Sequence, residues 1–217
     1  MTIIFAFLLS QSILLPIIIG LIRLRRLDKG YRPFFILLCI GFMTEVISFI
    51  LIQGFGKYNT IPTNIYALLE WTLIACLFHN WGFLRQKKNW FYALLAFTTL
   101  FWITENLVFR QIALFSPYFL FFYFFLIVLL SINKINFMIT HDNRNLFRNP
   151  KFLICIGFII YFIYMIVYYW AFEVSMFGKS EIAVNINFLM SYVNVFTNII
   201  YAIAFLLIPA PQKFTLD

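Results

Sequence analysis

Seven long apolar runs, each long enough to cross a lipid bilayer, constrain the fold of this chain more than any other feature. A hydrocarbon core about 30 Å thick needs roughly 20 mostly apolar residues in a helix. With 64% hydrophobic and only 11% charged residues, the chain has too little polar surface for a water-soluble protein. The sequence therefore predicts an all-α polytopic membrane protein, one seven-helix domain over residues 1–217, with spans at 2–22, 34–52, 61–81, 90–109, 114–132, 152–172 and 182–208.

Basic residues are divided unequally between the two sides of these spans. Of sixteen Lys and Arg residues, thirteen follow the first, third and fifth spans or lie in the C-terminal tail. Because basic loops stay in the cytoplasm, we expect an exoplasmic N-terminus and a cytoplasmic C-terminus. We interpret the net charge of +8 as a topology signal with contact to the lipid bilayer, and expect no nucleic-acid partner. The three residues on the other side are Lys57, Arg110 and Lys179.

Two pairs of segments indicate an internal repeat. Residues 33–42 resemble residues 150–158, and both segments contain Cys-Ile-Gly-Phe; residues 61–71 resemble residues 182–192 more weakly. Chance similarity between Phe- and Ile-rich helices is the alternative explanation. A three-span unit copied with the fourth span as linker gives a 3+1+3 parallel repeat, related by an axis along the membrane normal.

The 3+1+3 layout resembles that of SWEET-type and PQ-loop proteins, and the seven-span orientation is similar to that of microbial rhodopsins. Both resemblances concern architecture. No Pro-Gln pair lies inside a span, and the last span has no lysine that could bind retinal, so we expect no cofactor. Asn64, Tyr66 and Glu70, together with the Asn-rich last span, resemble bacterial seven-span membrane proteins of uncharacterised function, which implies a bacterial inner membrane.

Polar residues recur along one face of the last span. Their steps of four, three, four and three residues keep them on one stripe of a helix. Such a stripe lines a cavity or, alternatively, only hydrogen-bonds to neighbouring helices. The stripe consists of Asn187, Ser191, Asn194, Asn198 and Tyr201.

Three glutamates, Glu45, Glu70 and Glu105, lie within the second, third and fourth spans. No Lys or Arg lies in any predicted span to neutralise them, and ionisable residues within the membrane usually mark functional sites. Their depths predict a pocket that opens to the exoplasmic side and takes a small polar or cationic ligand. A neutral carboxyl group bonded to a nearby backbone or amide group is the alternative. The candidate ligand-binding residues are Glu45, Glu70, Glu105, Asn64, Tyr66, Asn187, Ser191, Asn194 and Asn198.

Three function classes fit these features. We place first a non-enzymatic receptor that binds its ligand from outside and signals through a cytoplasmic or membrane partner. A small-solute transporter similar to SWEET and PQ-loop proteins is the alternative, because of the repeat. An intramembrane lipid-modifying enzyme using Glu45 and Glu70 as an acid/base pair is the second alternative. We expect no catalytic residue and no metal site, because the two histidines and three cysteines have no ligand spacing.

Overall fold

The computed structural model describes residues 3–141, 145–175 and 181–209, with backbone only for 3–6, 26, 172–175, 181–185 and 187. Each predicted span corresponds to one helix or to two or three consecutive helical segments. In chain order the elements are α1 (Ile3–Ser10), η1 (Gln11–Ile13), α2 (Leu14–Ile22), η2 (Leu24–Arg26), η3 (Lys29–Tyr31), α3 (Arg32–Phe49), η4 (Ile50–Gly54), α4 (Thr60–Asn80), α5 (Lys88–Ile103), η5 (Thr104–Phe109), α6 (Pro117–His141), η6 (Leu146–Arg148), α7 (Pro150–Ser175) and α8 (Glu181–Leu207).

The protein is an integral, multi-pass membrane protein. Within the described residues, six helices are long and apolar enough to cross a bilayer, and a shorter apolar helix covers the end of the first predicted span. In that first span, α1 and α2 are joined by the 3-10 turn η1. Pro16 lies just beyond the turn and has no N–H to bond the carbonyl of Ser12 four residues earlier. The missing bond explains why the helix tightens at this point.

One predicted boundary is wrong. The fifth span was predicted to end at Ile132, whereas α6 continues to His141 and includes Lys134. The Lys134 ammonium group donates a hydrogen bond to the carbonyl oxygen of Trp81, 2.9 Å away, at the end of α4. This contact lets the helix continue past a charge, because the long lysine side chain reaches a polar acceptor at the edge of the membrane.

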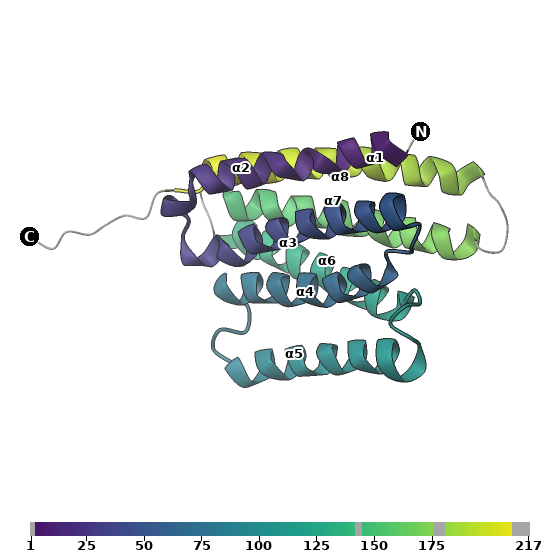
Figure 1. Cartoon of the computed structure of the whole chain (residues 1–217). Coiled ribbons are helices and arrows are strands. Elements are labelled where there is room, and N and C mark those ends of the chain that lie inside the picture. The colour runs from purple at the N-terminus through teal and green to yellow at the C-terminus, as the bar shows by residue number, and fades with distance from the viewer. Residues whose placement is uncertain (1–2, 142–144, 176–180, 210–217) are drawn as a thin grey trace, which may run out of the picture.

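Six helices form a ring when α1, η1 and α2 are taken together as one N-terminal helix. Around the ring the order is this N-terminal helix, then α3, α4, α6, α7 and α8, and α8 closes the ring by packing against α1 and α2. The helix α5 packs outside the ring against α4 (Figure 1). Parallel neighbours occur twice, at α4 with α6 and at α8 with α2. This order is compatible with a twofold axis along the membrane normal, so the ring agrees with the predicted repeat.

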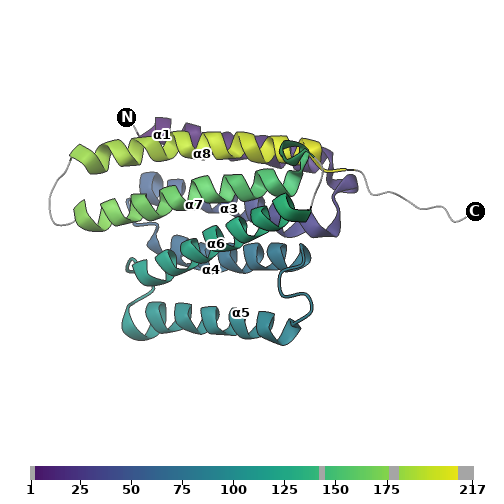
Figure 2. The same cartoon turned by 180° about the vertical axis from the view of Figure 1, so that it is seen from behind.

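The two ends of the bundle differ in charge. The starts of α3, α5 and α7 lie at one end together with the end of α8, and the starts of α4 and α6 lie at the opposite end with the start of α1 (Figures 1 and 2). We call the first the basic end, because most of the described Lys and Arg residues lie there, and the second the N-terminal end. At the basic end, Arg23 binds the last carbonyl groups of α8, at Phe205 (2.9 Å) and Leu206.

Candidate functional site

A small cavity at the centre of the ring brings polar side chains from several helices together. Its volume is about 50 Å³, which has room for a few water molecules or a small ion. Among the described side chains that line it, none is Lys or Arg. The lining residues are Ile13, Phe34, Leu37, Leu38, Tyr66, Glu70, Phe158, Tyr161, Phe162, Asn194, Thr197, Asn198 and Tyr201.

Glu70 is the carboxyl group of this cavity. It is the eleventh of the 21 residues of α4, so it lies about 15 Å from either end of the helix. The side chain is only 6% exposed. Tyr66 donates a hydrogen bond to one carboxyl oxygen (3.0 Å), and Tyr123 donates to the other (2.7 Å). Each oxygen keeps a further lone pair for another partner.

The two glycines of the repeated Cys-Ile-Gly-Phe motif each make room for a tyrosine of the cavity. A Cβ atom on Gly41 would lie 3.1 Å from the hydroxyl oxygen of Tyr66. A Cβ atom on Gly157 would lie 3.0 Å from Cζ of Tyr201 and closer still to Cε1. In both halves of the chain, a glycine on one helix therefore lets a tyrosine from the next helix approach closely.

Asn194 and Asn198 supply the amide wall. Asn194 is the midpoint of α8 and lines the same cavity as Glu70. The Asn198 amide donates to the Ser12 hydroxyl (2.8 Å) and to the Asn194 side-chain oxygen (3.2 Å). The polar stripe predicted for the last span thus contributes both to the cavity and to a contact between helices, so its two interpretations apply together.

Aromatic side chains close the cavity toward the basic end. The ring of Phe34, the third residue of α3, packs against Phe158, Tyr201 and Phe205 at centroid distances of 5.7, 5.0 and 5.4 Å. Phe34 and Phe205 are at most 1% exposed. Phe34, Phe158 and Phe205 therefore present no polar group on this side of the cavity.

Glu45 lies toward the opposite end. It is four residues beyond Gly41 on α3, one helical turn nearer the N-terminal end. Its side chain is exposed, lies beside the Ser10 hydroxyl and does not line the central cavity. Glu45 is therefore not among the described residues that line the central cavity with Glu70.

Glu105 and Asn64 occupy structural positions near the N-terminal end. The Glu105 carboxyl group, 3% exposed, accepts hydrogen bonds from the backbone N–H groups of Tyr118 (3.0 Å) and Phe119 (2.6 Å), and so caps α6. The Asn64 amide donates to the carbonyl groups of Ile112 and Leu114, both 2.9 Å away. Neither side chain lines the cavity.

The remaining candidates differ in how far the structure describes them. Ser191 is half-buried on α8 and does not line the cavity. The side chain of Asn187 lies outside the described residues. Of the nine candidate ligand-binding residues, the cavity includes Glu70, Tyr66, Asn194 and Asn198.

Sequence reasoning missed Tyr123. This residue interrupts the run Phe121-Phe122-Tyr123-Phe124-Phe125 with a single hydroxyl group. A buried tyrosine hydroxyl usually has a hydrogen-bond partner, so an isolated Tyr within a Phe run is the signal that could have indicated it. The partner itself, Glu70 on another helix, could not be read from the sequence.

The chemistry of the cavity suits a hard cation or a proton. Carboxyl, hydroxyl and amide oxygens are ligands that such ions prefer. Among the residues that the structure describes, no group of three or more His, Cys, Asp or Glu side chains could hold a metal ion.

No family model, curated protein or solved structure matches this chain.

Proposed function

We propose that this protein is a seven-helix receptor that binds a small monovalent cation, or the ammonium group of a small amine, beside Glu70. The ligand reaches the site from the N-terminal end, which the charge distribution assigns to the exoplasm. The resemblance to bacterial seven-span proteins suggests a bacterial inner membrane. The basic loops at the opposite end offer a surface for a signalling partner.

One observation carries the proposal: a carboxyl group at the middle of a membrane-spanning helix borders a void and, among the described side chains, has no basic partner. Tyr66 and Tyr123 occupy only part of its hydrogen-bonding capacity. An ionised carboxylate without a counter-ion is costly at this depth. A cation of the size of the cavity removes that cost and gains oxygen ligands from the surrounding side chains.

Access from one side supports a receptor. The Phe34, Phe158, Tyr201 and Phe205 rings separate the cavity from the basic end. The exposed Glu45 and the half-buried Ser10 lie toward the other end, where a carboxylate attracts cations. The ligand therefore enters and leaves by the same side.

Thermal unfolding of the purified protein in detergent tests the site. The probes are sodium, potassium, ammonium and methylammonium chlorides, with N-methylglucamine chloride at equal ionic strength as reference. A ligand that binds only the folded state stabilises it by RT ln(1 + [L]/Kd), or about 1.4 kcal/mol at ten times Kd. At least one small cation should raise the melting temperature, and Glu70→Gln should abolish that rise.

Glu45→Gln is the matched control, because it removes the same charge from a position nearer the N-terminal end that does not line the cavity. This variant should keep the cation-dependent rise in melting temperature. An equal rise in wild type and Glu70→Gln would refute the site. The absence of a rise with all four cations would refute cation binding.

A transporter is the second candidate function. The central depth of Glu70 and Asn194, together with the ring order of the helices, favours it, because transporters with parallel repeats bind substrate near the membrane midplane between the repeats. The two functions differ in liposomes that contain the protein. A receptor binds labelled methylammonium or sodium without exchanging it across the membrane. Counterflow of the label that Glu70→Gln abolishes would establish the transporter instead.

A further inference from the structure

Two adjacent cavities at the basic end share residues and differ in chemistry. The first, an aromatic groove of about 280 Å³, lies between the end of α4 and the second half of α6. The second, a basic pocket of about 650 Å³, lies among α6, the start of α7 and the end of α8. Lys134 and Phe137 line both, so the two spaces meet at these side chains.

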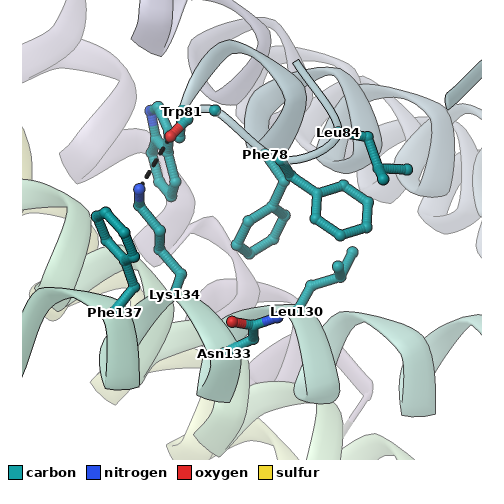
Figure 3. A pocket seen from close by; sticks show the side chains of 9 residues that line it. Phe78, Trp81, Leu84, Leu130, Asn133, Lys134 and Phe137 are labelled. Atoms are coloured by element: carbon teal, nitrogen blue, oxygen red, sulfur yellow. Dashed lines mark hydrogen bonds between the residues drawn. The ribbon is translucent and has the colours of Figure 1, made fainter. Parts of the chain in front are cut away.

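The aromatic groove is apolar and open on one side. Phe78 and Trp81 are buried and form its inner wall, whereas Asn133 and Phe137 are exposed. Figure 3 shows these side chains around one space, with Lys134 extended beside Phe137 and bonded to the carbonyl group of Trp81. An open apolar groove at the edge of the membrane suits a hydrocarbon chain.

The basic pocket carries positive charge. Arg148 and Lys151 line it beside the start of α7, and the Lys134 ammonium group lies at its border with the groove. Within the described chain, neither Arg148 nor Lys151 makes an ion pair with a carboxylate. The N-terminus of α7 adds the positive end of a helix dipole. These features complement a phosphate group.

We propose that the basic end binds one anionic phospholipid from the adjacent leaflet, with its phosphate in the basic pocket and an acyl chain in the aromatic groove. The lipid fits because both chemistries meet at Lys134, at the depth where headgroup and hydrocarbon meet. Basic pockets between helices on the cytoplasmic side bind anionic headgroups in membrane proteins. The site is separate from the central cavity and does not depend on a cation there.

Lipid binding to the purified full-length chain, measured by native mass spectrometry, tests this proposal. Phosphatidylglycerol is the probe and phosphatidylcholine the neutral reference. The double variant Arg148→Gln/Lys151→Gln should lower the affinity for phosphatidylglycerol on the order of tenfold, since each basic residue near a headgroup contributes to the attraction. The affinity for phosphatidylcholine should not change.

Lys87→Gln/Lys88→Gln is the matched control, because it removes two charges from exposed positions at the same end that line neither cavity. An equal loss of phosphatidylglycerol affinity in the control would show that the effect comes from general surface charge and not from the pocket, and would overturn the proposal. An unchanged affinity in Arg148→Gln/Lys151→Gln would overturn it as well.

The groove needs a separate variant. Asn133→Trp places an indole in the groove without a change in charge, and Ile132→Trp adds the same group at an exposed neighbouring position outside it. Only Asn133→Trp should displace phosphatidylglycerol. If Asn133→Trp has no effect and glycerol phosphate competes as well as the lipid, the pocket takes a soluble phosphate compound, and the lipid proposal fails.

Discussion

At the scale of single residues, close packing around small side chains shapes the central cavity. Gly157 on α7 lets the ring of Tyr201 approach the helix backbone, and Gly41 on α3 does the same for the Tyr66 hydroxyl. Both tyrosines then line the cavity that contains Glu70. The repeated Cys-Ile-Gly-Phe motif therefore has a local physical role: it sets how far the next helix can move inward.

The Gly157→Ala variant should be destabilised. The new Cβ atom would overlap the Tyr201 ring, and overpacking of this kind costs about 1–3 kcal/mol. Chemical or thermal unfolding in detergent measures the loss. The double variant Gly157→Ala/Tyr201→Leu should lose less than the sum of the single variants, because the shorter side chain removes the overlap.

Gly54→Ala is the control for this prediction. A Cβ atom at Gly54 would meet only Ile50, at 3.9 Å, so the substitution should leave stability nearly unchanged. Equal losses at positions 54 and 157 would show that helix flexibility, rather than the tyrosine contact, determines the effect.

At the scale of secondary-structure elements, polar side chains from other segments hydrogen-bond to the backbone N–H and carbonyl groups at helix ends. Glu105, in η5, accepts hydrogen bonds from the first two N–H groups of α6, those of Tyr118 and Phe119. Ser116, just before α6, donates to the Asn106 side chain (2.9 Å). Arg23 bonds the last carbonyl groups of α8. Unsatisfied helix ends are costly in a membrane, so these side chains stabilise the bundle and need no ligand.

The Glu105→Ala variant separates helix capping from ligand binding. Loss of a buried carboxyl acceptor leaves two backbone donors unpaired, and each costs about 1–3 kcal/mol. The melting temperature should therefore fall, whereas the rise caused by the effective cation should persist. If Glu105→Ala instead abolishes the cation-dependent rise while the protein remains folded, Glu105 belongs to the binding site.

At the scale of the whole molecule, charge distinguishes the two ends of the ring. Arg85 and Lys87 precede α5 and Lys88 begins it at one end, and Lys57 precedes α4 at the other. The asymmetry predicts orientation in the membrane, and orientation in turn determines whether Glu70 is reached from outside the cell or from the cytoplasm.

Single cysteines test this orientation. Cys39, Cys76 and Cys155 are first replaced by alanine, because all three are free thiols. In intact cells, an impermeant maleimide should label Lys57→Cys, and it should label Lys87→Cys only after the membrane is permeabilised. The reverse pattern would place the open side of the cavity in the cytoplasm and overturn the receptor proposal.

The sequence by itself determined the class of the protein and most of its helix boundaries. Long apolar runs have only one solution in lipid, a helix with internal backbone bonds, and this requirement acts locally. The stripe on the last span likewise indicated an inward face, because helical periodicity is a local property. The end of α6 was misjudged because Lys134 finds its acceptor, Trp81, on another helix.

Only the tertiary structure decided what each polar residue does. Glu45, Glu70 and Glu105 are alike in sequence, each a single carboxyl group in an apolar span. In the folded ring, the first is exposed beside Ser10, the second borders the central cavity, and the third caps α6. A carboxyl group in a membrane takes its role from the donors and space around it. Those come from distant segments of the chain: Tyr123, which bonds Glu70, lies 53 residues away from it.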